Sequence, residues 1–175
     1  MDDSIRPNPA TSTRTHLPDV QRSIALLYPE PPPDAWLVVS WLVSNDDFRS
    51  QWFKIVQADD AARHIVKQAR RYNVYVGLGL RHPDCTCKSG TRGASEDVYA
   101  LGGLWIELDH KAGVHTAQNL PTPQELLAFI EALPFSFSLL VDSGGGYHGY
   151  VLFKEMWLLD TPEEHQAAAL LLRRF

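Results

Sequence analysis

Hydrophobic and polar positions follow one another along this chain in two different rhythms. Apolar residues spaced three or four apart predict amphipathic helices, and runs rich in β-branched and aromatic residues between turn-forming residues predict strands. The expected helices cover residues 19–28, 59–71, 123–133 and 161–174. The expected strands cover residues 35–44, 51–56, 73–81, 101–110, 135–143 and 148–153. Because these helices and strands do not alternate in a strict βαβ order, an α+β fold is predicted.

The N-terminal part of the chain differs in composition from the rest. Seven of the twelve prolines lie in residues 1–35, and the first sixteen residues have almost no apolar periodicity. We therefore expect residues 1–35 to form a proline-rich tail with one short helix, followed by a single domain over residues 36–175. A secretory signal is not expected, because the N-terminus has two acidic residues and lacks the apolar stretch of a signal peptide. The longest apolar run, residues 36–43, is too short to cross a bilayer, so the expected location is cytoplasmic, with no membrane partner.

Composition and charge narrow the classes of protein further. With 175 residues, 45% of them hydrophobic, the chain can bury one core and is too short for a multidomain machine. The net charge of −5 excludes a uniformly basic protein that coats polyanions. Residues 63–92 nevertheless contain seven Lys and Arg residues and one Asp, a local net charge of +6. This stretch is either a surface that meets phosphates or the solvated face of a basic helix.

Two acidic residues interrupt the expected apolar strand at residues 101–110. Glu107 and Asp109 are two positions apart, so the period of a strand directs both side chains to the same face. Two carboxylates held close together repel each other, and a divalent cation with hard oxygen ligands relieves that repulsion. The pair therefore indicates either a metal site or an exposed strand edge, with acids facing water and Ile106 and Leu108 facing the core.

A glycine-rich turn joins the last two expected strands, and its sequence is Ser143-Gly144-Gly145-Gly146-Tyr147-His148. Consecutive glycines let backbone N–H groups approach an anion, and the flanking serine and histidine can add donors. The alternative is a plain hairpin turn, because no Walker lysine follows and the pattern is not G-x-G-x-x-G. Together with the acidic pair, the turn favours Mg²⁺ or Mn²⁺ with a triphosphate as ligands, and phosphoryl transfer as the reaction class.

The two cysteines, Cys85 and Cys87, are too close in sequence for an ordinary disulfide. With His82 they could supply three zinc ligands, the fourth coming from His110 or His115. Ordinary loop thiols are the favoured interpretation, since C-x-C spacing is unusual for zinc and any fourth ligand is distant; zinc is therefore not expected as a cofactor. The five tryptophans are expected in the core rather than as platforms for stacked bases.

Four segments of the chain resemble the archaeo-eukaryotic primase superfamily. They are NVYVGLGLR (73–81), TRGASEDVYALGGLWIELDHK (91–111), NLPTPQEL (119–126) and SLLVDSGGGYHGYVLF (138–153). The likeness is to the RepB-like primase-polymerase domains of plasmids, phages and other mobile elements, and it extends over roughly residues 36–175. It implies the α+β catalytic core of that superfamily, an RRM-like sheet packed on an N-terminal α/β unit.

The resemblance also implies roles for particular residues. The acidic strand of the superfamily supplies catalytic carboxylates that bind Mg²⁺ or Mn²⁺, which here fall on Glu107 and Asp109. Its serine and histidine motif engages the phosphates of the incoming nucleotide and maps onto Ser143 and His148, with the glycines between them as the cradle. Basic residues at similar positions imply contacts with phosphates or template for three more side chains, those of Arg81, Arg92 and Lys111.

The activity that the resemblance implies is that of a DNA primase or polymerase, a nucleotidyltransferase that joins NTPs or dNTPs on a DNA template. The implied partners are template, primer, nucleotide and further domains of the same parent chain, such as a helicase. The chain departs from the superfamily in two ways: Glu107 stands where aspartate is commoner, and the third carboxylate would lie beyond Phe175. We therefore expect a truncated catalytic domain. The alternatives are an inactive nucleotide- or single-strand-binding domain and a metal-dependent replication-initiator nuclease.

Overall fold

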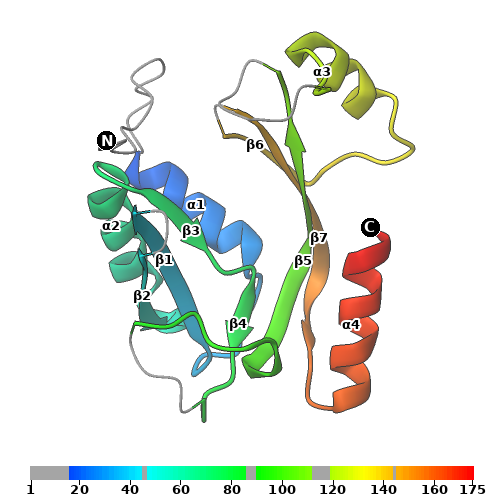
Figure 1. Ribbon diagram of the computed structural model, residues 1–175. Helices are drawn as coiled ribbons and strands as arrows, with labels where there is room; N and C mark the ends of the chain where they lie inside the picture. Colours follow the sequence, from blue (N-terminus) through cyan, green and yellow to red (C-terminus); the bar gives the residue numbers. More distant parts are fainter. Residues whose placement is uncertain (1–15, 45–46, 86–89, 112–118, 144) are drawn as a thin grey trace. The chain divides into compact units, whose positions relative to one another are not determined.

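The computed structural model describes residues 16–44, 47–85, 90–111, 119–143 and 145–175 (Figure 1). Residues 1–15 of the expected tail, Cys87, His115 and Gly144 therefore lie outside the described residues. The described part combines four α-helices with antiparallel strands, which confirms the α+β class. The helices are α1 (Leu17–Leu27), α2 (Ala58–Ala69), α3 (Pro123–Glu131) and α4 (Pro162–Arg174). The strands are β1 (Trp36–Ser44), β2 (Asp47–Lys54), β3 (Asn73–Val76), β4 (Gly79–Arg81), β5 (Val98–Asp109), β6 (Leu139–Asp142) and β7 (Gly146–Leu158).

The observed bounds of the helices lie close to the predicted ones, whereas those of several strands differ from the prediction. The prediction of one strand over residues 73–81 is wrong, because the backbone leaves the strand conformation at residues 77–78 and separates β3 from β4. At that break the carbonyl of Gly77 accepts a hydrogen bond from the Tyr28 hydroxyl, while the Gly77 N–H donates to the Val38 carbonyl at 3.0 Å. The break thus falls at a glycine, where residues from distant parts of the chain hold both backbone polar groups.

The two strands around the glycine turn also differ from expectation. β6 begins at Leu139 rather than at residue 135, and the ring of Phe137 lies against the Gly149 backbone just before it. β7 is longer than expected on both sides, running from Gly146 to Leu158 instead of over residues 148–153. Its extension carries Met156 and Trp157, which are apolar enough to continue a half-buried strand.

The chain divides into two compact units. The first unit comprises Met1–Gly102 and Lys154–His165, and the second comprises Gly103–Phe153 and Gln166–Phe175. The long strands β5 and β7 contribute residues to both. The carboxylate pair and the glycine turn belong to the second unit.

The first unit is built around β1, which pairs antiparallel with β2 on one edge and with β3 and β4 on the other. Four consecutive residues of β1, from Leu37 to Ser40, are buried, as expected for a central strand covered on both faces. The one polar member of this group, Ser40, shares a 2.8 Å hydrogen bond with Ser50 of β2, which offsets the cost of burying both hydroxyls. Helix α2 packs against these strands and against α1 (Figure 1).

The second unit contains the end of β5, the beginning of β7, and β6. β6 pairs antiparallel with β7, with Leu139 opposite Tyr150 and Val141 opposite His148. Helix α3 begins at a capping box in which Thr122 and Glu125 exchange hydrogen bonds, and those bonds lower the pKa of the Glu125 carboxyl below its ordinary value.

Within the described residues of the whole chain, no helix has the length and apolar character needed to cross a membrane.

Candidate functional site

The acidic residues lie near the end of β5. Trp105, Glu107 and Asp109 alternate with Ile106 and Leu108, so the aromatic ring and the two carboxylates share one face of the strand. The Glu107 side chain is 55% exposed. Its carboxylate is not simply solvated, however, because a residue of the neighbouring strand approaches it.

That residue is His148 of β7. Its Nε2 lies 3.5 Å from Oε1 of Glu107, and its side chain is 29% exposed. The imidazole also meets the Trp105 indole nearly edge-on, with ring centroids 5.9 Å apart and planes at 60°. The structure therefore brings together the acidic strand and the histidine of the glycine-turn motif, which the sequence separates by about forty residues.

The turn before β7 is held against the end of β5 by backbone contacts. The Ser143 hydroxyl and N–H both donate to the Gly146 carbonyl, each at 3.0 Å, which closes the turn on itself. The His110 N–H donates to the Gly145 carbonyl at 3.0 Å and links the turn to the residue after Asp109. The glycine cradle proposed from the sequence thus borders the carboxylates, while its member Gly144 lies outside the described residues.

Gly146 permits this close approach. A Cβ placed on it would lie 2.8 Å from the Cα of Asp109 and would collide with the Leu108 carbonyl. Real Cβ atoms are not found so close to backbone atoms, so any larger residue would force the turn away from the strand. The need for glycine here is steric and comes from the strand opposite.

The three basic candidates lie in different units. Arg81 and Arg92 belong to the first unit, where the Arg81 guanidinium donates to the Arg92 carbonyl at 3.2 Å. The Arg92 guanidinium lies 4.2 Å from the centre of the Phe48 ring. Lys111 belongs to the second unit and is exposed two residues after Asp109, its N–H bonded to the Pro121 carbonyl at 2.7 Å. Of the three, Lys111 shares a unit with the carboxylates.

Part of the basic stretch is occupied by local ion pairs. Arg63 of α2 lies 2.8 Å from the Asp60 carboxylate, one turn away on the same helix, and both side chains are more than half exposed. This pair raises the pKa of the Arg63 guanidinium and contributes little to stability because water screens it. For this residue, the geometry is that of a solvated helix face.

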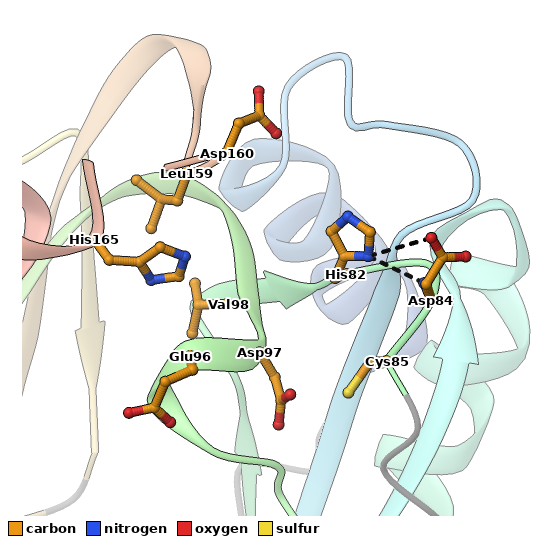
Figure 2. Close-up of a pocket in the computed structure, with 9 residues that line it drawn as sticks. All are labelled: His82, Asp84, Cys85, Glu96, Asp97, Val98, Leu159, Asp160 and His165. Atoms are coloured by element: carbon orange, nitrogen blue, oxygen red, sulfur yellow. Dashed lines mark hydrogen bonds and ion pairs between the residues drawn. The ribbon is translucent and has the colours of Figure 1, made fainter. Parts of the chain in front are cut away.

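Of the histidine and cysteine candidates for zinc, His82 and Cys85 line a pocket of the first unit (Figure 2). Their side chains stand apart around a cavity of about 370 Å³, which is also lined by His165, a residue that the sequence did not suggest as a ligand. His82 accepts a hydrogen bond from the Asp84 N–H at 3.1 Å through Nδ1. Across the described ranges no three His, Cys, Asp or Glu side chains are grouped to hold a metal ion. His110, named as a distant fourth ligand, is buried in the second unit beside Tyr147.

Trp105 is a residue of the site that the sequence interpretation missed. The expectation that the tryptophans lie in the core is wrong for this residue, which is 43% exposed. The signal was present, because Trp105 is two positions before Glu107 and the same strand period that pairs the acids places the indole beside them.

Comparisons with known proteins add no assignment: no family model, no curated protein and no solved structure matches the chain.

Proposed function

We propose that this chain carries the metal- and nucleotide-binding part of a DNA primase-polymerase, a nucleotidyltransferase that joins NTPs or dNTPs on a DNA template. The observation that carries the proposal is the contact between His148 and Glu107, with Asp109 on the same strand face. A carboxylate pair and a histidine-bearing glycine turn are the two motifs on which the resemblance to the primase superfamily rests. Their contact supports treating them as one site.

The donor set at this site fits Mg²⁺ or Mn²⁺. Glu107 and Asp109 offer hard carboxylate oxygens from one strand face, and Mg²⁺ in nucleotide enzymes is commonly held by one or two carboxylates together with substrate phosphates and water. When bound, the ion would lower the pKa of the attacking 3′-hydroxyl and neutralise charge on the triphosphate. The longer side chain of Glu107 reaches one methylene farther from β5 than aspartate would.

The other residues of the site are suited to hold the triphosphate. His148 faces Glu107 through Nε2, so a phosphate oxygen beside that carboxylate lies within reach of an imidazole donor. Ser143 and the backbone of the glycine turn lie next to the end of β5 through the His110 and Gly146 contacts. Lys111 adds a positive charge two residues beyond Asp109. Binding and orienting a polyanion beside the carboxylates is therefore the task assigned to this chain's own side chains.

The proposal includes a finer fold and a set of partners. The division into an N-terminal unit with its own core and a second unit that holds the site supports the primase-type architecture of an α/β unit and an RRM-like sheet. Template and primer are proposed to meet the basic stretch at residues 63–92, through sequence-independent phosphate contacts. Further domains of the parent chain and a cytoplasmic location remain part of the proposal.

The proposal is tested by primer extension. The purified protein is incubated with Mn²⁺ or Mg²⁺, labelled dNTPs or NTPs, and a primed single-stranded template. Asp109→Asn is expected to abolish extension, because it removes one of two charged oxygen donors while keeping the side-chain shape. The matched control is Glu155→Gln, which neutralises an exposed carboxylate on β7, away from the Glu107 and Asp109 pair on β5. It is expected to leave extension unchanged.

Two results would contradict the proposed activity, and a third would contradict the proposed site. Strand cleavage that requires Asp109 would favour the replication-initiator nuclease. Nucleotide binding that requires Asp109 without extension under any metal or template would favour the inactive binding domain. Extension that survives Asp109→Asn would place the chemistry away from β5.

A further inference from the structure

Trp105 differs from the other four tryptophans in exposure, because they are half-buried and Trp105 is exposed. The indole N–H groups of Trp36 and Trp52 donate to backbone carbonyls at 3.1 and 2.7 Å, and the Trp41 ring packs on His64. Trp105 contacts His148 nearly edge-on and remains 43% exposed, so much of the indole surface faces outward. A single exposed aromatic residue is common on protein surfaces. Trp105 is of interest because it lies beside His148 and on the same strand face as Glu107.

We propose that Trp105 is a stacking platform for the base of the nucleotide bound at this site. The ring lies two residues from Glu107 along β5, a spacing of about 7 Å in a strand. It also contacts the imidazole assigned to the phosphates. A nucleotide carries its phosphates and its base on opposite sides of the sugar, so phosphates beside His148 leave the base within reach of the indole. This inference rests on the proposed function and deepens it.

Stacking suits a site that must accept every base. Aromatic side chains on the face of a sheet bind bases through their π-faces, and this contact is sequence-tolerant because all bases have such a face. Hydrogen bonds to base edges would instead favour one base. The template can then select the nucleotide by pairing, while Trp105 contributes affinity that is similar for all four and somewhat greater for the larger purines.

The test separates the base from the phosphates. Dissociation constants of inorganic triphosphate, dATP and dCTP are measured by calorimetry with excess Mn²⁺ for the unaltered protein, Trp105→Ala and Trp105→Phe. Loss of one stacked base is expected to weaken dATP binding by roughly 5- to 150-fold in Trp105→Ala, to leave triphosphate binding within about twofold, and to be largely reversed in Trp105→Phe. Tyr75→Ala is the matched control, since Tyr75 is an equally exposed strand aromatic in the first unit.

Three outcomes would overturn the inference. Equal weakening of dATP and triphosphate would show that Trp105 positions His148 and does not contact a base. If the unaltered protein binds triphosphate as tightly as dATP, the base is not recognised, although the proposed metal and phosphate site stands. If it binds neither ligand, the proposed function fails together with the platform.

Discussion

The glycine at position 146 offers the sharpest test of how the site is built. A Cβ on Gly146 would lie 2.8 Å from the Cα of Asp109 and 2.9 Å from the carbonyl carbon of Leu108, whereas ordinary contacts begin at 3.4 Å. Both obstacles are backbone atoms of β5, so no side chain can rotate away to relieve the clash. The Leu108 carbonyl oxygen lies nearer still, so Gly146→Ala must move the turn and the strand apart by about 1 Å.

The size of the effect follows from that displacement. Forcing an extra carbon into a well-packed position costs typically about 1–3 kcal/mol, which we expect as the loss in the free energy of unfolding. The same shift moves His148 relative to the carboxylates. Because misplacement of reacting groups by about 1 Å can cost roughly a hundredfold in rate, we expect kcat/KM for primer extension to fall by roughly tenfold to a hundredfold.

The assay combines urea unfolding with primer extension, and Gly77→Ala is the control. A Cβ on Gly77 would meet its nearest atoms at 3.6 to 3.9 Å, which is ordinary contact. That substitution should leave extension unchanged and stability equal or higher by up to about 1 kcal/mol, because alanine restricts the unfolded chain. If Gly146→Ala is as stable and as active as Gly77→Ala, the turn does not press on β5 and the site described above is wrong.

Two further predictions concern the free energy of unfolding. Burial lowers the pKa of the His64 imidazole, with Lys67 adding to the shift, and its Nε2 is buried without a partner among the described residues. As the pH falls, His64 is therefore protonated in the unfolded chain before it is protonated in the folded protein, so the free energy of unfolding should be highest above about pH 6.5 and decrease below it. Urea unfolding between pH 7.5 and 5 should show a smaller decrease for His64→Phe. The same dependence on pH in both proteins would argue against this role of His64. Thr161 caps α4 by exchanging hydrogen bonds with Glu164 at 3.0 to 3.2 Å. Thr161→Ala should lower the free energy of unfolding by about 1 kcal/mol while Thr161→Ser retains it, and equal stability of all three proteins would show that the cap is not needed.

The helix ends were predictable because their signals are local. The sequence Thr161-Pro162-Glu163-Glu164 specifies a capping box with proline at the first helical position, and α4 begins there. The box at Thr122 and Glu125 starts α3 in the same way. Each signal acts over one helical turn, so distant parts of the chain do not alter it.

The strand ends were less predictable because distant contacts decide them. The apolar run at residues 73–81 contains Gly77 and Gly79, which can loosen a strand but do not show where it ends, and the Tyr28 hydroxyl donates to the Gly77 carbonyl just after the end of β3. Similarly, nothing within residues 135–138 shows that Phe137 packs against Gly149 rather than joining the strand. In both cases the deciding partner lies outside the window in which a pattern can be detected.

The sequence by itself determined the α+β class, the helices, and the shared face of Glu107 and Asp109, since each depends on a period of two or 3.6 residues. The tertiary structure decided what stands beside that face. β5 and β7 are neighbouring strands, and their alignment sets His148 against Glu107 and Trp105 and leaves no room for a side chain at Gly146. A sequence period specifies the face to which a side chain points, whereas its neighbour across the strands depends on pairing between distant segments, which local spacing does not encode.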